Sequence, residues 1–385
     1  MGDAGTACPG VPGFSLRVRA ARPMLEHWIR LANLQLPPRQ ACGLLDHFGD
    51  PRALFAASAG ELEAASAGLR LPARLLDPSF APTASQLGAA ERLGMRAIGR
   101  EDAEYPRPLR EIPDAPPVLF VRGTLEETDR FAVAIVGTRH PTPYGRSVAG
   151  KLARDLAGAG LVVASGGAIG IDAAAHRACL EAGGRTVVVL GCGHDVEYPR
   201  ENQPLFEQIV ATGRGAVVSE FPPGCQPEAW RFPQRNRIIS GLSRGVVVVE
   251  AGRQSGALIT ATLAGEHGRE VMAVPGNVDR PASKGTNALL KDGATLVEDA
   301  EDVLRTLGIL TLRPPGVDAP ERPRRPDLTE SQLRLLECLD LTPRHIDSVA
   351  AELGSEPAAL SLDVTLLELA GVIRRLPGNT FIRVL

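Results

Sequence analysis

The sequence lacks paired cysteines and long apolar runs, and each absence argues against a class of protein. Its six cysteines form no C-x-x-C pair and stand at no zinc-like spacing with histidine, so no metal site is expected. No stretch of about 18 apolar residues occurs, so we expect no transmembrane helix. The N-terminus has no basic start followed by an apolar run, so we expect no signal peptide. A reduced, cytoplasmic compartment fits these absences best.

Lysine and aromatic residues are also scarce. Aromatics make up 4% of the chain, and only three of the 42 basic residues are lysines, at positions 151, 284 and 291. Genomic base composition accounts for such an arginine bias, so the bias by itself indicates no function. The net charge of −3 excludes a histone-like polycation but allows a local basic groove, because electrostatic binding of DNA depends on clustered charge.

The 385 residues are expected to form several domains, because a single hydrophobic core rarely extends over a chain of that length. Residues 1–22 are rich in Gly, Pro and Ala and are predicted to be a disordered tail. Residues 23–104 are predicted to form a small helical domain, residues 105–310 a large domain and residues 328–385 a last small one, with a Pro/Arg-rich linker at 311–327. The helices expected in the first domain are Glu26–Ala32, Pro38–Phe48, Pro51–Ala56 and Glu61–Ala67.

From residue 131, apolar runs of strand length alternate with segments of helix length. This pattern predicts a Rossmann-like α/β domain, with a doubly wound, mostly parallel sheet covered by helices on both faces. The expected strands of this pattern are Ala132–Val136, Leu161–Ala164, Thr186–Leu190, Ala216–Val218, Gly245–Glu250 and Glu270–Val274. Before it, residues 105–130 are expected to form an extended entry segment that ends in a strand at Val118–Val121. The expected helices are Tyr144–Ala159, Ile171–Ala182, Pro204–Ala211, Asn236–Leu242 and Ala257–Glu266.

Two glycine-rich loops follow neighbouring strands of this sheet. Gly137-Thr138-Arg139 ends one strand, and Ser165-Gly166-Gly167-Ala168-Ile169-Gly170 ends the next. Each precedes a helix whose N-terminal amides attract an anion, so the pair indicates a phosphate-binding crevice at the carboxyl ends of the strands. Neither loop reads G-x-G-x-x-G, so no dinucleotide cofactor is implied. Tight turns that need positive φ are the alternative interpretation.

A basic segment follows Phe232-Pro233. Arg235 and Arg237 flank Asn236 at the expected start of a helix, and guanidinium groups bind phosphate in a bidentate manner. Phe232 or Trp230 can stack on a base. Pairing of the arginines with Glu220, Glu228 or Glu250 is the alternative, and we expect it for one of the two arginines but not for both. Lys284, beside a glycine and close to Asn287, adds a further phosphate contact.

Other polar residues of this domain point to no chemistry. Cys192 and His194 lack a third metal ligand, and a glycine turn that closes the crevice is the better interpretation. Ser165 and His176 stand too far apart across a helix start for hydrolysis, so His176 is expected to cap or pack. No paired carboxylates, nucleophile elbow or metal-ligand set appears, and we expect a binding protein rather than an enzyme.

The C-terminal residues 328–385 read as helices followed by a hairpin, which together predict a winged helix. The helices are expected from Leu328, over His345–Leu353 and over Glu356–Ala370, with the hairpin over 371–384. Winged helices usually bind duplex DNA. The expected recognition helix, however, carries Glu356, Asp363 and Glu368 and no Arg or Lys. A protein contact or a regulatory role is therefore favoured.

In their order along about 180 residues, these motifs resemble those of the DprA/Smf family. The matching positions are Gly137-Thr138-Arg139, Tyr144-Gly145, Ser165-Gly166-Gly167-Ala168 with Gly170-Ile171-Asp172 and His176, Tyr198-Pro199 with Asn202, Phe232-Pro233 with Arg235-Asn236-Arg237-Ile238-Ile239, Ser255-Gly256 with Thr260-Ala261, Val274-Pro275-Gly276, and Gly285-Thr286-Asn287. The flanking domains resemble the family's sterile-alpha-motif-like and winged-helix domains. Ile169 departs from the pattern, because many relatives carry arginine there, and isoleucine cannot bind a phosphate.

The resemblance implies a protein that binds and protects single-stranded DNA, forms a homodimer and loads the recombinase RecA during natural transformation, with no cofactor and no membrane contact. The expected DNA-binding residues are Gly137, Thr138, Arg139, Ser165, Gly166, Gly167, Ala168, Gly170, Phe232, Arg235, Asn236, Arg237, Lys284 and Asn287. A nucleotide-hydrolysing enzyme of the lysine-decarboxylase-like phosphoribohydrolase group is the alternative. The P-G-G-x-G-T-x-x-E run of that group would fall at residues 250–261, which lack its proline and final acid. A regulator of duplex DNA that acts through the winged helix is a third class.

Overall fold

The computed structural model describes the chain apart from a few segments. The described residues are 14–66, 68–77, 79–309, 328–340, 342–369 and 372–383. The chain forms two compact units, one of residues 1–130 with 187–242 and the other of residues 131–186 with 243–385.

Two segments that were predicted from the sequence, the tail and the linker, lie partly or wholly outside the described residues. The linker expected at 311–327 lies wholly outside the described residues, as do residues 1–13 of the expected tail. Residues 14–22 begin a helix, α1, which extends over Phe14–Asn33.

Nine strands form one mostly parallel sheet with helices around it, as the sequence predicted. They hydrogen-bond in the order β1-β2-β6-β5-β4-β3-β7-β8-β9. β3 runs parallel to β4 and β7, and β8 runs parallel to β7 and β9, whereas β2 is antiparallel to β1 and β6. The strands are β1 Arg96–Gly99, β2 Val118–Gly123, β3 Ala132–Val136, β4 Val162–Ser165, β5 Thr186–Val189, β6 Gly215–Ser219, β7 Ser243–Val248, β8 Glu270–Ala273 and β9 Thr295–Leu296.

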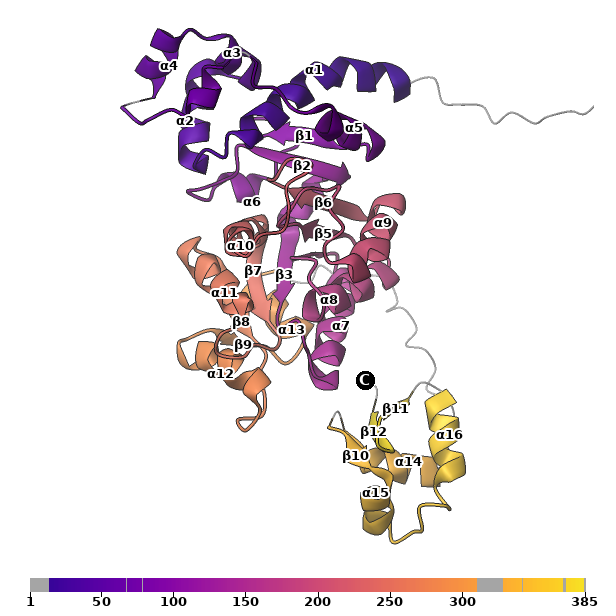
Figure 1. Cartoon of the computed structure of the whole chain (residues 1–385). Helices are drawn as coiled ribbons and strands as arrows, with labels where there is room; N and C mark the ends of the chain where they lie inside the picture. Colours follow the sequence, from indigo (N-terminus) through magenta and orange to yellow (C-terminus); the bar gives the residue numbers. More distant parts are fainter. Residues whose placement is uncertain are drawn as a thin grey trace, which may run out of the picture. The chain divides into compact units, whose positions relative to one another are not determined.

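In the second unit, β3 and β4 are buried along their whole length, which explains their continuous apolar sequences. Val133 and Ile135 of β3 belong to a core that also contains side chains of α7 (Pro143–Gly158), α8 (Ile171–Glu181) and α13 (Ala300–Thr306). Figure 1 shows these three helices together beside β3.

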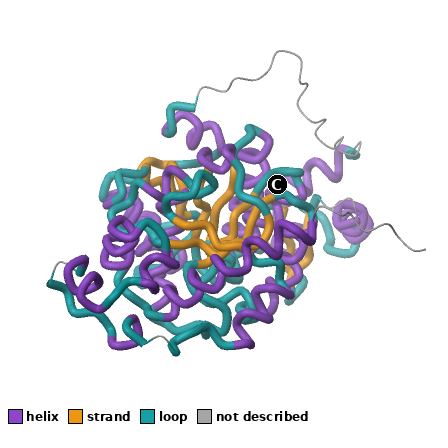
Figure 2. Tube along the Cα trace, turned by 90° about the horizontal axis from the view of Figure 1, so that it is seen from above, coloured by secondary structure: helices purple, strands orange, loops and turns teal. Residues whose placement is uncertain are grey.

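The other side of the second unit's strands is covered by different helices. α11 (Gly256–Glu266) packs on β7 and β8, and α12 (Lys284–Lys291) packs on β8. The buried Ala257, Ala261 and Ala264 of α11 lie outside the core formed by α7, α8 and α13. Figure 2 shows the orange strands between purple helices, the arrangement of a doubly wound fold.

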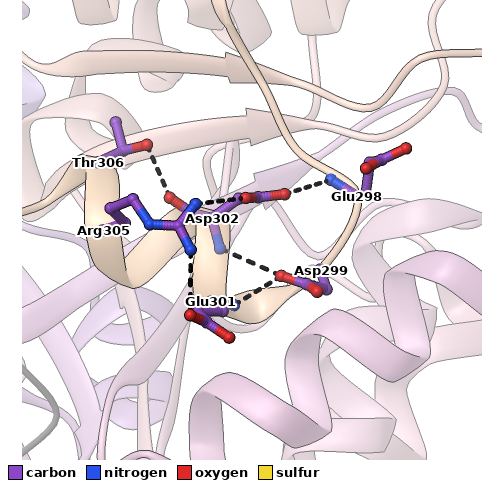
Figure 3. A network of polar contacts seen from close by, with 6 residues as sticks. All are labelled: Glu298, Asp299, Glu301, Asp302, Arg305 and Thr306. Atoms are coloured by element: carbon purple, nitrogen blue, oxygen red, sulfur yellow. Dashed lines mark hydrogen bonds and ion pairs between the residues drawn. The ribbon is translucent and has the colours of Figure 1, made fainter.

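Acidic residues at its N-terminus stabilise α13. The Asp299 carboxylate accepts hydrogen bonds from the backbone N–H groups of Glu301 and Asp302, at 2.9 and 3.1 Å (Figure 3). Arg305 forms ion pairs with Glu301 and Asp302, which lie four and three residues earlier in the same helix. Negative charge at a helix N-terminus is favourable, so these interactions hold the helix that places Val303 in the core.

In the first unit, short helices enclose an apolar core of their own, with Leu44, Leu54 and Leu62 almost fully buried. Ser58 and Glu61 form a reciprocal cap at the start of α4, which fixes that helix end. The helices of this unit are α1, α2 Pro38–Phe48, α3 Pro51–Ala56, α4 Ala59–Ala65, α5 Ala84–Arg92, α6 Arg107–Arg110, α9 Gln203–Ala211 and α10 Arg231–Leu242.

The C-terminal residues form the winged helix that the sequence predicted. Three helices pack around Leu335, Val349 and Leu367 beside a three-stranded antiparallel sheet of order β10-β12-β11. The last helix begins at Ser361 and not at Glu356, since residues 357–360 form turns before it. The elements are α14 Glu330–Glu337, β10 Arg344–His345, α15 Ile346–Leu353, α16 Ser361–Leu369, β11 Ile373–Leu376 and β12 Thr380–Arg383. Within the described residues, no helix has the length and apolar character that crossing a bilayer requires.

Candidate functional site

The loop after β3 presents one exposed cation. The Thr138 N–H donates to the Glu250 carbonyl at 2.7 Å, and the Thr138 carbonyl accepts from the Ile171 N–H at 3.2 Å. These backbone bonds tie the predicted Gly137-Thr138-Arg139 segment to the end of β7 and the start of α8. The Arg139 side chain lies at the surface of this fixed loop.

The Ser165–Gly170 loop forms an amide cradle, but an internal carboxylate occupies it. The N–H groups of Gly166 and Ala168 donate to Asp172 Oδ2 at 3.1 and 3.3 Å. Ser165 is fully buried, and its hydroxyl donates to the Ile135 carbonyl at 2.6 Å. Ser165 is thus engaged by the Ile135 carbonyl, and the two amides by Asp172, so the protein itself satisfies the groups that were expected to hold a ligand phosphate.

Backbone conformation confirms the alternative interpretation of this loop for two of its glycines. Gly167 and Gly170 have φ values of 67° and 91°, which side chains rarely adopt. A Cβ atom at Gly170 would also lie 2.4 Å from the Thr138 carbonyl oxygen. Gly170 thus allows the two loops to contact each other.

A second buried carboxylate occupies the N-terminus of α7. The Glu250 side chain is 3% exposed and accepts from the backbone N–H and the hydroxyl of Thr142, at 2.9 and 2.6 Å. Burial, and then the charges of Glu250 and Glu298, raise the pKa of Tyr144 in the first turn. The roles of Asp172 and Glu250 as internal acceptors were not predicted from the sequence. An acid in the first turn after a glycine loop, as at Asp172, is the signal that could have revealed one of them.

The loop after β8 presents a second exposed cation. Asn287, predicted to contact DNA, uses its side-chain amide within the protein. It accepts from the Gly276 N–H at 3.2 Å and donates to the Gly276 carbonyl at 2.9 Å. Lys284 is the first residue of α12, and its side chain is exposed. Asn287 therefore positions the segment from which Lys284 projects.

In the first unit, α10 begins at Arg231, whereas the helix was predicted from the sequence to begin at Asn236. Pro233 lies in the first turn, where a proline ring is tolerated. Arg235 and Arg237 consequently lie inside the helix and not at its N-terminus. They are 5% and 3% exposed, and Asn236 between them is 8% exposed.

Both arginines are engaged within the protein. Arg237 pairs with Glu220 at 2.6 Å and with Asp114 at 3.3 Å. Arg235 donates to the Val189 carbonyl and, from Nε, to Asn236 Oδ1 at 3.3 Å. The prediction that these side chains meet phosphate at the surface does not agree with their burial, and the paired alternative with Glu220 holds for Arg237.

Phe232 is half-buried and packs against two residues that follow β5. Its ring lies 5.4 Å, between centroids, from the Tyr198 ring. A Cβ atom at Gly191 would lie 2.9 Å from it, so only glycine leaves room for the ring there. Phe232 therefore anchors the start of α10 against the loop after β5.

Two histidines and one cysteine that the sequence singled out are buried and serve packing. His194 is fully buried and donates from Nε2 to the Phe120 carbonyl at 2.9 Å, and burial lowers its pKa to about 4. Burial raises the pKa of Cys192 to about 12. His176 is fully buried, with Nδ1 at 2.6 Å from the Thr186 hydroxyl, which confirms the packing interpretation. Over the described ranges, no three His, Cys, Asp or Glu side chains gather in a group that could hold a metal ion.

Comparison with known families gives matches over most of the chain. A model of the family described as DNA recombination-mediator protein A matches residues 96–308. A DprA winged helix domain model matches residues 319–379.

Curated relatives are similar over about three quarters of this chain. Protein Smf of Synechocystis sp. is 36% identical over 315 residues, which cover 74% of this chain and 79% of the relative. Protein Smf of Escherichia coli is 40% identical over 303 residues, which cover 77% and 79%.

Two solved structures are also similar. DNA processing protein A (DprA) from Streptococcus pneumoniae matches with a TM-score of 0.63 and 38% identity, covering 72% of this chain and 95% of that one. A structure of DNA processing protein A from Helicobacter pylori, described for its single-stranded DNA binding mode, matches with a TM-score of 0.50 and 31% identity, covering 55% and 95%.

Proposed function

The chain belongs to the DprA/Smf family of DNA processing proteins, and from this membership we propose that it binds and protects single-stranded DNA and loads RecA onto it during natural transformation. The observation that supports the proposal is the similarity to the Helicobacter pylori protein, whose structure is described for its single-stranded DNA binding mode. We place the protein in the cytoplasm as a homodimer.

Side-chain cations, and not helix N-termini, are the proposed phosphate contacts. Asp172 occupies amide groups of the loop before α8, and Glu250 occupies the amide and hydroxyl of Thr142, the N-cap of α7, so a phosphate would meet negative charge at both places. Arg139 and Lys284 are exposed and follow the carboxyl ends of β3 and β8, where open α/β sheets bind ligands. Both are proposed to contact the DNA backbone.

The other predicted site residues support these two cations from within the protein. Gly137, Thr138 and the Ser165–Gly170 loop fix the backbone around Arg139, and Asn287 fixes the segment around Lys284. Arg235, Asn236, Arg237 and Phe232 hold α10 in the first unit. Substitution of these residues is expected to lower the stability of the fold and not to remove a direct contact with DNA.

Catalysis is not part of the proposed function. Within the described residues the thiols of Cys179 and Cys192 are buried, and burial raises the pKa of each to about 12, so neither is a ready nucleophile. Release of free base from a nucleoside monophosphate, with multiple turnovers, would contradict this part of the proposal.

For the winged helix we propose a protein contact or a regulatory role. α16 carries no Arg or Lys, and its Leu362 and Leu366 are 69% and 44% exposed. A helix that reads the major groove uses basic and polar side chains, whereas exposed leucines favour protein contact.

Filter binding of the full chain, with single-stranded and duplex oligonucleotides at two salt concentrations, tests the proposal. We expect tight binding of the single strand, weak binding of the duplex and a loss of affinity as salt rises. Equal affinity for both forms would instead support a duplex regulator. RecA filament formation on strands coated by a single-strand-binding protein tests the loading step, which we expect the chain to accelerate.

A further inference from the structure

Trp230 is an exposed aromatic residue in a chain that has few aromatics. It is one of two tryptophans, and it is 51% exposed, whereas Trp28 is 8% exposed. It directly precedes α10, two residues before Phe232. An exposed tryptophan offers a large, rigid ring with one polar edge, which suits contact with a ligand.

The indole is held in one orientation by its neighbours. Its Nε1–H donates to Glu228 Oε2 at 2.7 Å. The Arg231 guanidinium carbon lies 4.7 Å from the centroid of the indole ring, and 5.5 Å from that of Phe221. Arg231 therefore lies against both rings and covers one face of the indole.

Arg231 is itself fixed, which makes the arrangement rigid. It is 5% exposed, pairs with Glu228 at 2.7 Å and donates to the Gln226 carbonyl. With one face covered by this immobile guanidinium, the exposure of Trp230 must come from the opposite face and the outer edge. The protein thus presents a flat aromatic surface that needs no reordering before it binds a ligand.

The chemistry of the surroundings selects the kind of ligand. Arg231 is neutralised by Glu228, which is half exposed, so the site offers no unpaired positive charge to a phosphate. A planar, uncharged aromatic group is the ligand that the exposed indole face suits. Nucleobases stack on aromatic side chains in this way, independently of sequence.

We propose that Trp230 is a base-stacking residue, whose open face receives an unpaired base of single-stranded DNA. The inference rests on the proposed function. It adds a contact with a base to the contacts with the DNA backbone that are assigned to Arg139 and Lys284. The indole, guanidinium and Phe221 ring would then form a continuous stack beneath that base.

Tryptophan fluorescence tests the stacking directly, since Trp230→Phe leaves Trp28 as the single tryptophan. Addition of oligo-dT to the full chain should quench the wild-type emission, and an abasic oligonucleotide of equal length should not. The same titration should leave the emission of Trp230→Phe unchanged. Quenching by the abasic strand equal to that by oligo-dT would overturn the proposal.

Affinity measurements separate stacking from folding. Trp230→Ala should weaken oligo-dT binding about 5- to 150-fold, the range measured for base–aromatic stacking, whereas Trp230→Phe should retain most of the affinity. Binding of the abasic strand should stay at the wild-type level in both variants, and the slope of log affinity against log salt should not change. Leu69→Ala, at another apolar residue that is 56% exposed, is the matched control and should bind as the wild type.

The outcomes distinguish this inference from the function on which it rests. If the wild type binds oligo-dT and Trp230→Ala binds it equally well, the stacking role is wrong and the proposed function stands. An equal loss of oligo-dT and abasic binding in Trp230→Ala also overturns the stacking role, because the defect is then structural. If the wild type binds no single strand, the proposed function itself fails.

Discussion

Arg237 and Glu220 form a buried ion pair at 2.6 Å, with the two side chains 4% and 8% exposed. Asp114 lies 3.3 Å from the same guanidinium, on its Nε side. Burial of charges is costly, and mutual pairing offsets that cost. The pair therefore fixes α10 within the first unit and removes Arg237 from the surface.

Arg237→Ala is expected to destabilise the protein by about 3–5 kcal/mol, because it leaves Glu220 buried without its partner. Thermal unfolding followed by circular dichroism measures the effect. Arg107→Ala is the control, since Arg107 pairs with Glu111 at 3.4 Å while 87% exposed, and its removal should cost less than about 1 kcal/mol. A variant Arg237→Ala that unfolds like the wild type but no longer binds single strands would restore Arg237 as a DNA-binding residue.

Asp172→Ala should lower the free energy of unfolding by about 1–3 kcal/mol, since the Gly166 and Ala168 amides lose their acceptor. The vacated cradle should then accept an external anion. Sulfate is expected to raise the melting temperature of Asp172→Ala more than it raises that of the wild type or of Asp172→Asn, which keeps an acceptor oxygen. Equal sulfate effects in all three proteins would show that no anion site was vacated.

Arg139→Ala and Lys284→Ala should each weaken single-strand binding similarly for all base compositions, and lower the salt slope by about 0.7 for each phosphate that the protein no longer neutralises. Filter binding over a salt series gives the slope. Lys291→Ala is the matched control, because Lys291 is also exposed and ends the helix that Lys284 begins. An unchanged slope in Lys284→Ala would remove this residue from the interface.

Acid is expected to destabilise the fold through His194. Burial lowers the folded-state pKa of His194 from 6.5 to about 4, so the unfolded chain binds the extra proton first as the pH falls. The stabilisation is present above pH 6.5, is lost between about pH 6.5 and 4, and amounts to about 3 kcal/mol. Urea unfolding across this range measures it. His194→Gln should flatten this part of the profile, and a slope that persists in the variant would assign it to other groups.

A chain that ends at residue 309 should retain most of its single-strand binding, because the winged helix has its own core and its α16 has no basic residues. Filter binding of the truncated and full-length chains makes the comparison. Leu362→Ser with Leu366→Ser, in the full chain, should likewise leave single-strand affinity unchanged. A complete loss of affinity on truncation would mean that the winged helix contributes directly to the DNA interface.

Local sequence predicted the elements of the fold closely where its signals were strong. Pro38–Phe48 and Pro51–Ala56 are helices with the predicted bounds, since a proline starts each one and Gly49 or Ala57 follows it. The predicted start of α10, Asn236, was wrong by five residues, because the helix begins at Arg231 and tolerates Pro233 within its first turn. Short or irregular elements, such as β1 and β9, were not predicted, because two to four residues carry too little periodicity.

By itself, the sequence determined the doubly wound sheet and the winged helix, because apolar periodicity and the placement of glycine and proline act over a few neighbouring residues. The family followed from the resemblance of its ordered motifs to those of known relatives. Only the tertiary structure decided which predicted charges face solvent. Arg237 meets Glu220 from 17 positions away, Arg235 meets the Val189 carbonyl from 46, and Thr142 meets Glu250 from 108. Such pairings depend on how distant segments pack, and they leave Arg139 and Lys284 exposed while the arginines of α10 become part of the core.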